Sequence, residues 1–339
     1  MNKRKAITVF RILTSLKFYG FVLSDWVKSL SSFLRRYEML ALGAIQLGKD
    51  TYIARGTALL APSGTTIQIG DATTINDYCV IIGDVTIERY CLLSYNIYIS
   101  SGNHQATLRP QWLIRDQDQL FHQHHLHNDH DSSQVHIEED CWIGWGVFIK
   151  PGVYIGKGSV IGASTVVTRD VPPYSIQVGI PNRELSKRLE FEPPNSLDAT
   201  KEEHLPYFYC GFLLQKSEIE RSLNSQMLIA RRVVRLMMKG GAFQKISLTG
   251  CLLDGVERIR LHLKCNQAQI AEIIVDSPSF QIDCHEILMS TFPESIFRSS
   301  LLSKYNELEI EASEISTNPR YSRNKDLEYL YGLKTISLS

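Results

Sequence analysis

The sequence predicts a mainly β protein of two parts, a parallel β-solenoid followed by an antiparallel β-sandwich-like domain. Two regularities carry this prediction. Large aliphatic residues recur at every sixth position over residues 135–172, and apolar and polar residues alternate over residues 243–338. A period of six fits neither a helix nor an alternating strand and indicates a short structural repeat, whereas a period of two is typical of half-buried strands.

The period of six specifies the shape of the solenoid. Its aliphatic residues are Ile137, Ile143, Ile149, Ile155, Ile161 and Val167, and glycine follows at Gly144, Gly156 and Gly162. If each hexad supplies one short strand and one turn, three hexads complete a triangular coil of about eighteen residues. The aliphatic residue then points inward, and glycine lets the backbone turn the corner. Small or β-branched residues stand two positions earlier, as a narrow interior requires: Val135, Cys141, Val147, Val153, Ser159 and Thr165.

Length and composition fit a chain of two domains. The 339 residues are 44% hydrophobic and 21% charged, and 36 basic residues balance 36 acidic ones. A zero net charge gives no electrostatic reason to expect a nucleic-acid partner, and we expect none. Seven cysteines lack CxxC spacing, and Cys79, Cys91 and Cys141 fall on small inward positions. We therefore expect packed thiols in a reducing, cytoplasmic compartment.

Residues 1–42 precede the repeat and form a predicted N-terminal helical segment. They are apolar but interrupted by charge, so no run reaches the roughly 18 apolar residues that a spanning helix needs. Apolar residues recur at helical spacing from Val27 to Tyr37. Two interpretations stay open: helices that cap the end of the prism, or a basic amphipathic segment that attaches the protein peripherally to the inner face of a membrane.

The solenoid domain is predicted over residues 43–190. Period six is faint from Leu47 to Leu59, slips in a small loop and resumes from Ile69 to Ile99, whereas residues 105–134 keep no period and are polar, aromatic and histidine-rich. An insertion of this kind must leave the coil. We predict one long loop thrown out from a corner of the prism, and long loops on rigid scaffolds often carry function.

The solenoid ends at a pair of prolines, Pro172 and Pro173, which cannot continue a sheet ladder. Residues 191–240 are predicted to form a linker and a helix around Lys216 to Met238. Over residues 241–339, six or more short strands separated by polar turns predict a β-sandwich-like accessory domain.

Residues 69–104 and 135–187 resemble the hexapeptide-repeat acyltransferases, which fold as left-handed parallel β-helices. They resemble in particular the acetyltransferases that modify sugars of maltose, galactoside, lipopolysaccharide and capsule type. The most specific piece is CWIGWGVFIKPGVYIGKGSVIGASTVVTRDVPP followed by GIPNR. The resemblance implies acetyl-CoA as co-substrate, a homotrimer of parallel prisms and an active site between neighbouring subunits. The ending NKDLEYLYGLKTISL is similar, more loosely, to β-sandwich accessory modules found beside carbohydrate enzymes.

Sugar O-acetylation needs a base that removes a proton from the acceptor hydroxyl, and histidine is suited to this step. In the family that the sequence resembles, the base stands just before the protruding loop, and ISSGNH puts His104 at that place. The resemblance therefore implies His104 as the general base of a direct transfer. Asn103, Trp112 and Asp118 are expected to bind the sugar. The alternative for His104 is a loop histidine without a role.

Motif matching to the same family implies cofactor contacts from Trp145, Ala163, Thr168 and Arg169, and a contact between Arg183 and a phosphate of coenzyme A. Trp145 departs from the family, which usually has a small residue there. It could stack on the cofactor or block the usual path. Because any prism has corner residues, a structural role is the alternative for each member of this set.

The loop also carries five histidines, His122, His124, His125, His127 and His130. His122 and His127 share the five-residue separation found in prism-shaped carbonic anhydrases, but there the ligands lie on regular coil strands. Histidines in an irregular loop lack that support, and we predict no metal site.

The sequence therefore predicts an acetyl-CoA-dependent O-acetyltransferase that acts on a sugar or a surface-polysaccharide precursor. Two alternatives stay open. One is a metal-dependent hydratase of the same fold. The other is a non-catalytic trimeric scaffold that presents the C-terminal domain as three linked glycan-binding sites.

Overall fold

The computed structural model describes residues 44–62, 64–123, 133–213, 227–253, 255–285, 304–314 and 329–339. The predicted N-terminal helical segment, residues 1–42, lies outside the described residues. The chain divides into two compact units. One holds the residues up to Val171 together with Ser175–Arg188, and the other holds Pro172–Tyr174 and Leu189–Ser339. Within the described part of the chain, none of the helices has the length and hydropathy needed to cross a membrane.

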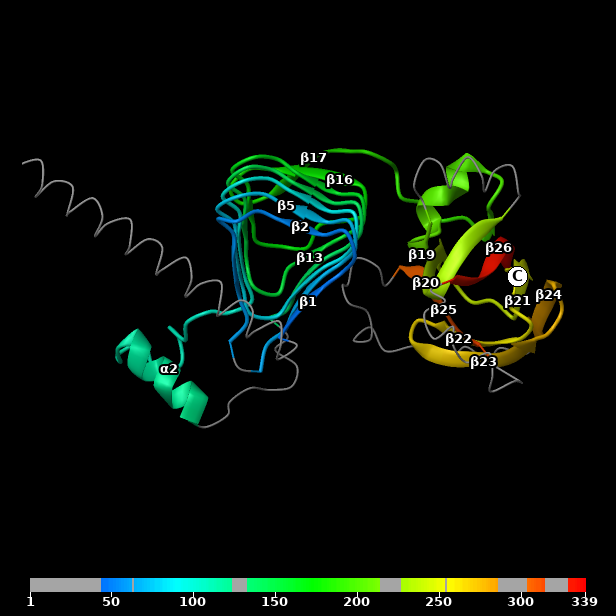
Figure 1. The fold of residues 1–339 in the computed structure, drawn as a ribbon. Helices are drawn as coiled ribbons and strands as arrows, with labels where there is room; N and C mark the ends of the chain where they lie inside the picture. Colours follow the sequence, from blue (N-terminus) through cyan, green and yellow to red (C-terminus); the bar gives the residue numbers. More distant parts are fainter. Residues whose placement is uncertain are drawn as a thin grey trace, which may run out of the picture. The chain divides into compact units, whose positions relative to one another are not determined.

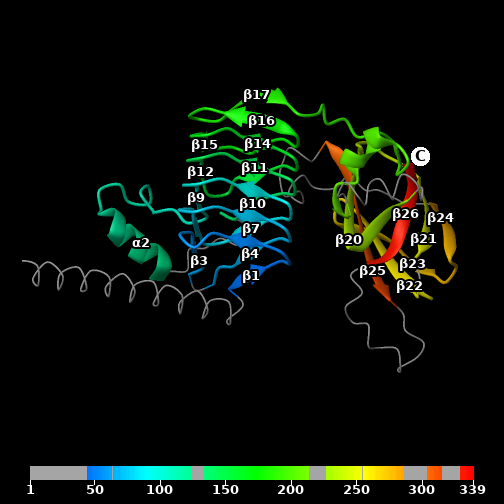
Figure 2. The same cartoon turned by 45° about the horizontal axis from the view of Figure 1, so that its top comes forward.

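The first unit is a triangular prism of parallel strands stacked coil upon coil (Figures 1 and 2). Its first face contains β1 (Ile45–Leu47), β4 (Ile67–Ile69), β7 (Val85–Ile87), β10 (Val135–Ile137) and β13 (Tyr154–Ile155). The second face contains β2 (Tyr52–Ile53), β5 (Thr74–Ile75), β8 (Leu92–Leu93), β11 (Trp142–Ile143), β14 (Val160–Ile161) and β16 (Ser175–Val178), with β17 (Arg183–Lys187) antiparallel at its edge. The third face contains β3 (Ala58–Leu60), β6 (Val80–Ile82), β9 (Tyr98–Ser100), β12 (Phe148–Ile149) and β15 (Val166–Val167). We call the edges of the prism the 1–2, 2–3 and 3–1 corners.

The interior of the prism is filled by the residues that the period of six selects. Ile137, for example, pairs with Ile87 in the coil below and with Ile155 in the coil above, and all three are buried. Stacking identical positions in this way buries a continuous column of aliphatic side chains, each contributing roughly 1.5–3 kcal/mol. Burial also raises the pKa of the Cys79 and Cys91 thiols, which stay protonated inside the prism. The predicted solenoid is confirmed.

The glycine that follows the inward aliphatic residue is required by the neighbouring coil. A Cβ on Gly144 would lie 2.7 Å from the main-chain nitrogen of Ala163. The left-handed backbone of the 2–3 corner falls instead two residues later, where Gly146 has φ +67° and Ser164 has φ +57°. Close approach between coils, more than the turn itself, therefore fixes the glycine.

The chain leaves the prism after β9, at the 3–1 corner, and returns at β10. The return is in register, since Val135 pairs with Val85 and Ile137 with Ile87. The predicted structureless loop is only partly correct, because the excursion contains the helix α2 (Ile114–Gln123) (Figures 1 and 2). Among the α2 positions 114–121, whose burial the structure describes, the most buried is occupied by Gln117. A polar residue at the buried position removes the apolar period by which a helix is recognised in a sequence.

The second unit is the antiparallel β domain that the period of two predicts. Its elements are β18 (Ser196–Asp198), the 3-10 helix η1 (Glu202–Tyr207), β19 (Cys210–Phe212), β20 (Leu228–Lys239), β21 (Lys245–Leu252), β22 (Ile259–Cys265), β23 (Ala268–Val275), β24 (Ser279–His285), β25 (Tyr305–Glu314) and β26 (Tyr329–Leu338). The strands form one continuous hydrogen-bonded ladder in the order β23-β22-β25-β20-β26-β21-β24, and β18 joins β26 while β19 joins β20.

The helix predicted around Lys216 to Met238 is wrong over its second half, where residues 228–239 form β20. This strand lies between β25 and β26, and Leu236, Met237 and Met238 are all buried. A strand covered on both faces reads as a continuous apolar run without alternation, which cannot be told from a helix by periodicity. Residues 214–226 lie outside the described residues.

The inward column makes a direct prediction about stability. Ile161→Ala removes a fully buried side chain from the prism and should lower the free energy of unfolding by about 2–5 kcal/mol, because the rigid coils cannot collapse into the cavity. Val160→Ala, on the outward side of the same strand, should cost about 1 kcal/mol or less. Urea unfolding followed by tryptophan fluorescence reports on the first unit, since Trp142 and Trp145 lie on the prism and the chain has no tryptophan after residue 145. Equal losses in the two variants would contradict the inward assignment.

Candidate active site

The exit of the chain from the prism is fixed by hydrogen bonds just before His104. Ser101 is buried, and its N–H donates to the Ile82 carbonyl at 3.0 Å. Its Oγ accepts the N–H of Asp84 at 2.7 Å, and the Asp84 carboxylate accepts the N–H of Thr66 at 2.7 Å. The ladder between coils thus continues to within three residues of His104, so the prism sets the direction in which the excursion starts.

His104 is held by a carboxylate from α2. His104 Nδ1 lies 2.7 Å from Asp118 Oδ2, while Asp118 Oδ1 accepts the N–H of Gln105 at 2.7 Å. The Asn103 side chain accepts the N–H of His104 at 3.0 Å. The imidazole itself is 82% exposed. With Asp118 ionised, the proton of a neutral imidazole is held at Nδ1, and Nε2 keeps a lone pair that can accept a proton from outside.

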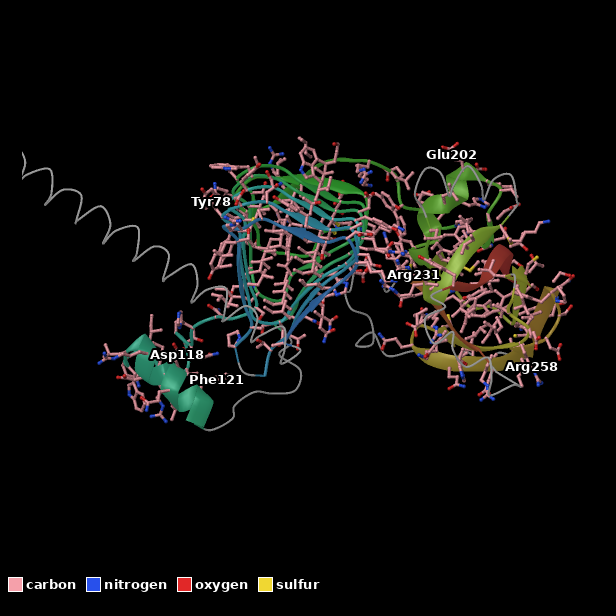
Figure 3. All side chains as sticks on the ribbon, in the orientation of Figure 1. Tyr78, Asp118, Phe121, Glu202, Arg231 and Arg258 are labelled. Carbon is pink, nitrogen blue, oxygen red and sulfur yellow. The ribbon has the colours of Figure 1, made fainter. Side chains whose placement is uncertain are left out.

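The start of the excursion is tied to α2 by Gln117, which is 1% exposed. Its Oε1 accepts the N–H of Arg109 at 2.9 Å, and its Nε2 donates to the Trp112 carbonyl at 3.2 Å. Gln117 and Asp118 are consecutive residues, so the clamp on the loop and the partner of His104 belong to the same turn of helix. Figure 3 shows Asp118 on α2.

The sugar-binding expectation for Asp118 changes in the light of these contacts. Both of its carboxylate oxygens already face His104 and Gln105, which favours a role in positioning His104 over a contact with the acceptor. Asn103 likewise holds the main chain at His104. Trp112 is 41% exposed and stays available to a ligand.

Three of the residues expected at the cofactor gather around Asn182, which is buried. Asn182 Oδ1 accepts the N–H of Thr168 at 3.0 Å, and its main-chain carbonyl accepts Nη2 of Arg169 at 2.7 Å. Arg183 follows directly and is exposed. Asn182 also donates its own N–H to Val166 at 2.9 Å, which folds the GIPNR tail back onto the last coil. The sequence motif contained Asn182, but its role depends on this fold-back.

The 3–1 corner is basic above the exit of the excursion. Lys150 follows β12 and donates its N–H to Val167 at 2.9 Å, which places it one coil below Thr168. The third face stacks β9, β12 and β15 in register. The segment that leads to His104 therefore leaves the prism at the same corner that carries Lys150 in the next coil and Arg169 in the coil after that. At the usual strand spacing, the exit and Arg169 are separated by about 10 Å along the prism axis.

The other two expected cofactor residues lie across the third face. Trp145 and Ala163 occupy the 2–3 corner in successive coils, and the Trp145 carbonyl accepts the N–H of Ser164 at 2.7 Å. Both side chains are exposed. Between the two corners, the rings of Tyr98 and Phe148 stack outward on the third face, with centroids 5.4 Å apart and planes 3° apart. The described structure thus separates the expected cofactor residues into two groups on either side of an aromatic surface.

The side chains of the five loop histidines are not among the described parts of the structure, so the structure does not test whether they bind a metal. His122 lies in α2 without a described side chain, and His124, His125, His127 and His130 lie outside the described residues. On the first face, the ligand atoms of Glu88, His136 and Glu138 lie within 4.8 Å of one another. His136 Nε2 is 3.0 Å from Glu88 Oε1, and Glu138 accepts the main-chain N–H of Lys157 at 3.0 Å, so all three side chains already have partners within the stacked coils.

Residues 134–169 match the family model described as bacterial transferase hexapeptide, six repeats. This part of the prism is made of bacterial transferase hexapeptide repeats. The repeats contain Trp145, Ala163, Thr168 and Arg169, whereas His104 and Arg183 lie on either side of them. Among curated proteins, none matches the chain.

Several solved structures are similar to part of this chain. A hexapeptide-repeat-containing acetyltransferase from Vibrio cholerae O1 biovar eltor, complexed with acetyl coenzyme A, is 27% identical and covers 46% of this chain and 78% of that one, with a TM-score of 0.36. A maltose O-acetyltransferase from Clostridium difficile 630 is 27% identical and covers 47% and 77%, with a TM-score of 0.36. A galactoside acetyltransferase in complex with coenzyme A is 27% identical and covers 42% and 64%, with a TM-score of 0.34.

Proposed function

We propose that this protein transfers an acetyl group from acetyl-CoA to a hydroxyl of a sugar or surface-polysaccharide precursor. The observation that carries the proposal is the placement of His104 and its partner Asp118. They emerge from the same corner of the hexapeptide prism that carries Lys150, Thr168 and Arg169. A positioned base beside a basic corner is what acyl transfer from a phosphate-rich thioester requires.

His104 is the base in the proposed reaction. Its Nε2 takes the proton of the acceptor hydroxyl as the oxygen forms a bond to the thioester carbonyl carbon, and Asp118 stabilises the imidazolium. A main-chain N–H stabilises the resulting oxyanion. The carbon–sulfur bond then breaks, and His104 returns its proton to the departing thiolate. A covalent route through Cys79 or Cys91 is disfavoured, because burial keeps these thiols protonated.

The basic corner is the proposed site for the phosphates of acetyl-CoA. Arg169 uses Nε and Nη2 on the Asn182 carbonyl, which fixes its guanidinium while leaving Nη1 for a ligand. Lys150 and Arg183 add positive charge. The thioester arm would lie along the third face, over Tyr98 and Phe148, towards Ala163 and Trp145. In this arrangement Trp145 borders the path of the arm at the 2–3 corner.

We further propose a homotrimer in a cytoplasmic location, with the active site shared between neighbouring prisms. Support comes from exposed apolar side chains on the second face and its 2–3 corner, which a soluble monomer rarely leaves in contact with water. Tyr52, Leu92 and Trp142 lie in one outward column of the second face. The corner adds the exposed side chains of Tyr78, Tyr95, Trp145 and Ile180.

The glycan-binding scaffold has less support. Sugar-binding surfaces commonly present exposed aromatic rings. In the described part of the second unit, the exposed large hydrophobic side chains are those of Val233 and Ile274, neither of which is aromatic. Peripheral attachment to a membrane through residues 1–42 stays a prediction.

Two substitutions test the base and its partner. His104→Ala should lower kcat by about 10²- to 10⁴-fold without lowering the thermal stability, because the imidazole is exposed. Asp118→Asn can donate its amide to Nδ1 and so place the imidazole proton on Nε2, which should lower kcat by about 10-fold or more. The measurement is thiol release from acetyl-CoA with maltose, galactosides, N-acetylhexosamines, and sugars bearing a carboxylate or a phosphate as acceptors.

The matched control for Asp118→Asn is Asp116→Asn, which removes an exposed carboxylate from the same helix. It should keep the full rate. Equal rates in Asp118→Asn and Asp116→Asn, or no acetyl transfer by the wild type to any of these acceptors, would rule out the proposed reaction.

A charge on the second face tests the trimer. Trp142→Glu should convert the trimer into folded monomers, because a carboxylate would have to be desolvated in the apolar contact. Gln68→Glu places the same charge on an exposed position of the first face and should leave the trimer intact. Light scattering after size-exclusion chromatography measures the mass. A monomeric wild type, or a trimer that Trp142→Glu does not disturb, would count against this interface.

A further inference from the structure

A cation and an aromatic ring are stacked on the loop that carries His104. The Arg109 guanidinium lies 4.6 Å from the centroid of the Trp112 ring, and both residues are exposed. An exposed pair of this kind is worth about 0.5–1 kcal/mol to the fold. That is small compared with what a loop gains by turning the same tryptophan inwards, so its exposure on the loop calls for another explanation.

The pair is built into a rigid support. Gln117 is buried and bonds to the main chain of both members, accepting the N–H of Arg109 and donating to the carbonyl of Trp112. Trp112 in turn donates its N–H to the Arg109 carbonyl at 2.8 Å, closing a tight turn. The main chain of each member is therefore fixed, and the stacking contact restricts the two side chains, which lowers the entropy that they lose when a ligand binds.

The pair is also tied to His104. Gln117 holds Arg109 and Trp112, and the next residue of α2, Asp118, holds His104 and Gln105. Two consecutive residues of one helix therefore hold the base and the pair. The pair belongs to the same supported segment as the base that an acceptor hydroxyl must reach.

The chemistry of Arg109 and Trp112 indicates which groups of an acceptor they would bind. A guanidinium that lies over a ring still presents the N–H groups of its edge, in a fork that matches carboxylate and phosphate oxygens. The opposite face of the indole can take the apolar face of a sugar ring. The nearby Arg115 differs, since its Nε lies 3.4 Å from Asp116 Oδ1, which neutralises its charge locally.

We propose that Arg109 and Trp112 select an acceptor glycan that carries an oxyanion, a carboxylate or a phosphate, close to the hydroxyl that is acetylated. This inference rests on the proposed acetyl transfer and names its acceptor class. It assigns to Arg109 a specificity-determining contact with the substrate and to Gln117 the positioning of that contact.

An array of defined glycans, probed with the full-length protein, tests the proposal. It carries neutral oligosaccharides, the same cores bearing glucuronic or sialic acid, and cores bearing a sugar phosphate. The wild type should bind at least one anionic series about tenfold more strongly than its neutral core. The series bound distinguishes carboxylate from phosphate. Arg109→Gln should abolish the preference, and Arg109→Lys should restore it only in part, because it keeps the charge but loses the planar fork.

Arg115→Gln is the matched control and should keep the preference. Binding to neutral and anionic cores alike, binding to none of them, or an equal loss in Arg109→Gln and Arg115→Gln would overturn the proposal. Calorimetry with acetyl-CoA on the same preparations distinguishes a failure of the proposed acceptor class from a failure of the proposed acetyl transfer. If acetyl-CoA binds and the anionic preference is absent, the acceptor class is wrong while the acetyl transfer stands. If the wild type does not bind acetyl-CoA, the proposed function itself fails.

Discussion

The main-chain hydrogen bonds between successive coils fix the corners of the prism and the point at which the excursion leaves it. A strand of two or three residues has no stability of its own, so each coil exists only because the next one completes its hydrogen bonds and covers its aliphatic residues. Phe148 and Lys150 bond to Thr165 and Val167 in this way, and Ser101 bonds to Ile82. The coil to which a residue belongs therefore determines its position along the prism axis, and its place within the coil determines the corner at which it lies. For this reason Lys150 and Arg169 share a corner with the exit towards His104.

The excursion from residue 101 to residue 134 shows how such a scaffold carries a precise site on a long insertion. The prism fixes both ends, through Ser101 at the exit and the pairing of Val135 with Val85 at the return. Inside the excursion, two side chains of α2 do what the coils cannot. Gln117 holds the outgoing segment and Asp118 holds His104. A buried amide that uses both of its polar atoms is costly to disrupt, so this support is rigid as well as local.

The sequence predicts the structure best where the structure repeats. It predicts least where a single hydrogen bond determines the role of a residue. The inward aliphatic residues were predicted one by one, because period six maps directly onto coils. His104 could be placed from the motif before the excursion. The roles of Gln117, Asp118 and Asn182 could not, since each depends on a hydrogen bond that exists only after the loop or the tail has folded back. The second half of the helix expected around Lys216 to Met238 is a strand, because a strand buried on both faces loses the alternation that identifies it. Residues 1–42 and most of the loop histidines lie outside the described residues, and the expectations about them stay predictions.

The proposed function requires that the corner formed by Lys150, Thr168 and Arg169, completed by Arg183, binds acetyl-CoA beside His104. Calorimetry with acetyl-CoA on the wild type and on Arg169→Ala/Arg183→Ala measures this binding. Arg188→Ala serves as control, because Arg188 bonds to Asp140 and Gly158 at the 1–2 corner. We predict binding by the wild type and the control, and binding about tenfold weaker or more in the double variant, since two hydrogen-bonded charges are lost from the phosphate site. If a folded wild type does not bind acetyl-CoA, or if the double variant binds as tightly as the wild type, this corner is not the acetyl-CoA site.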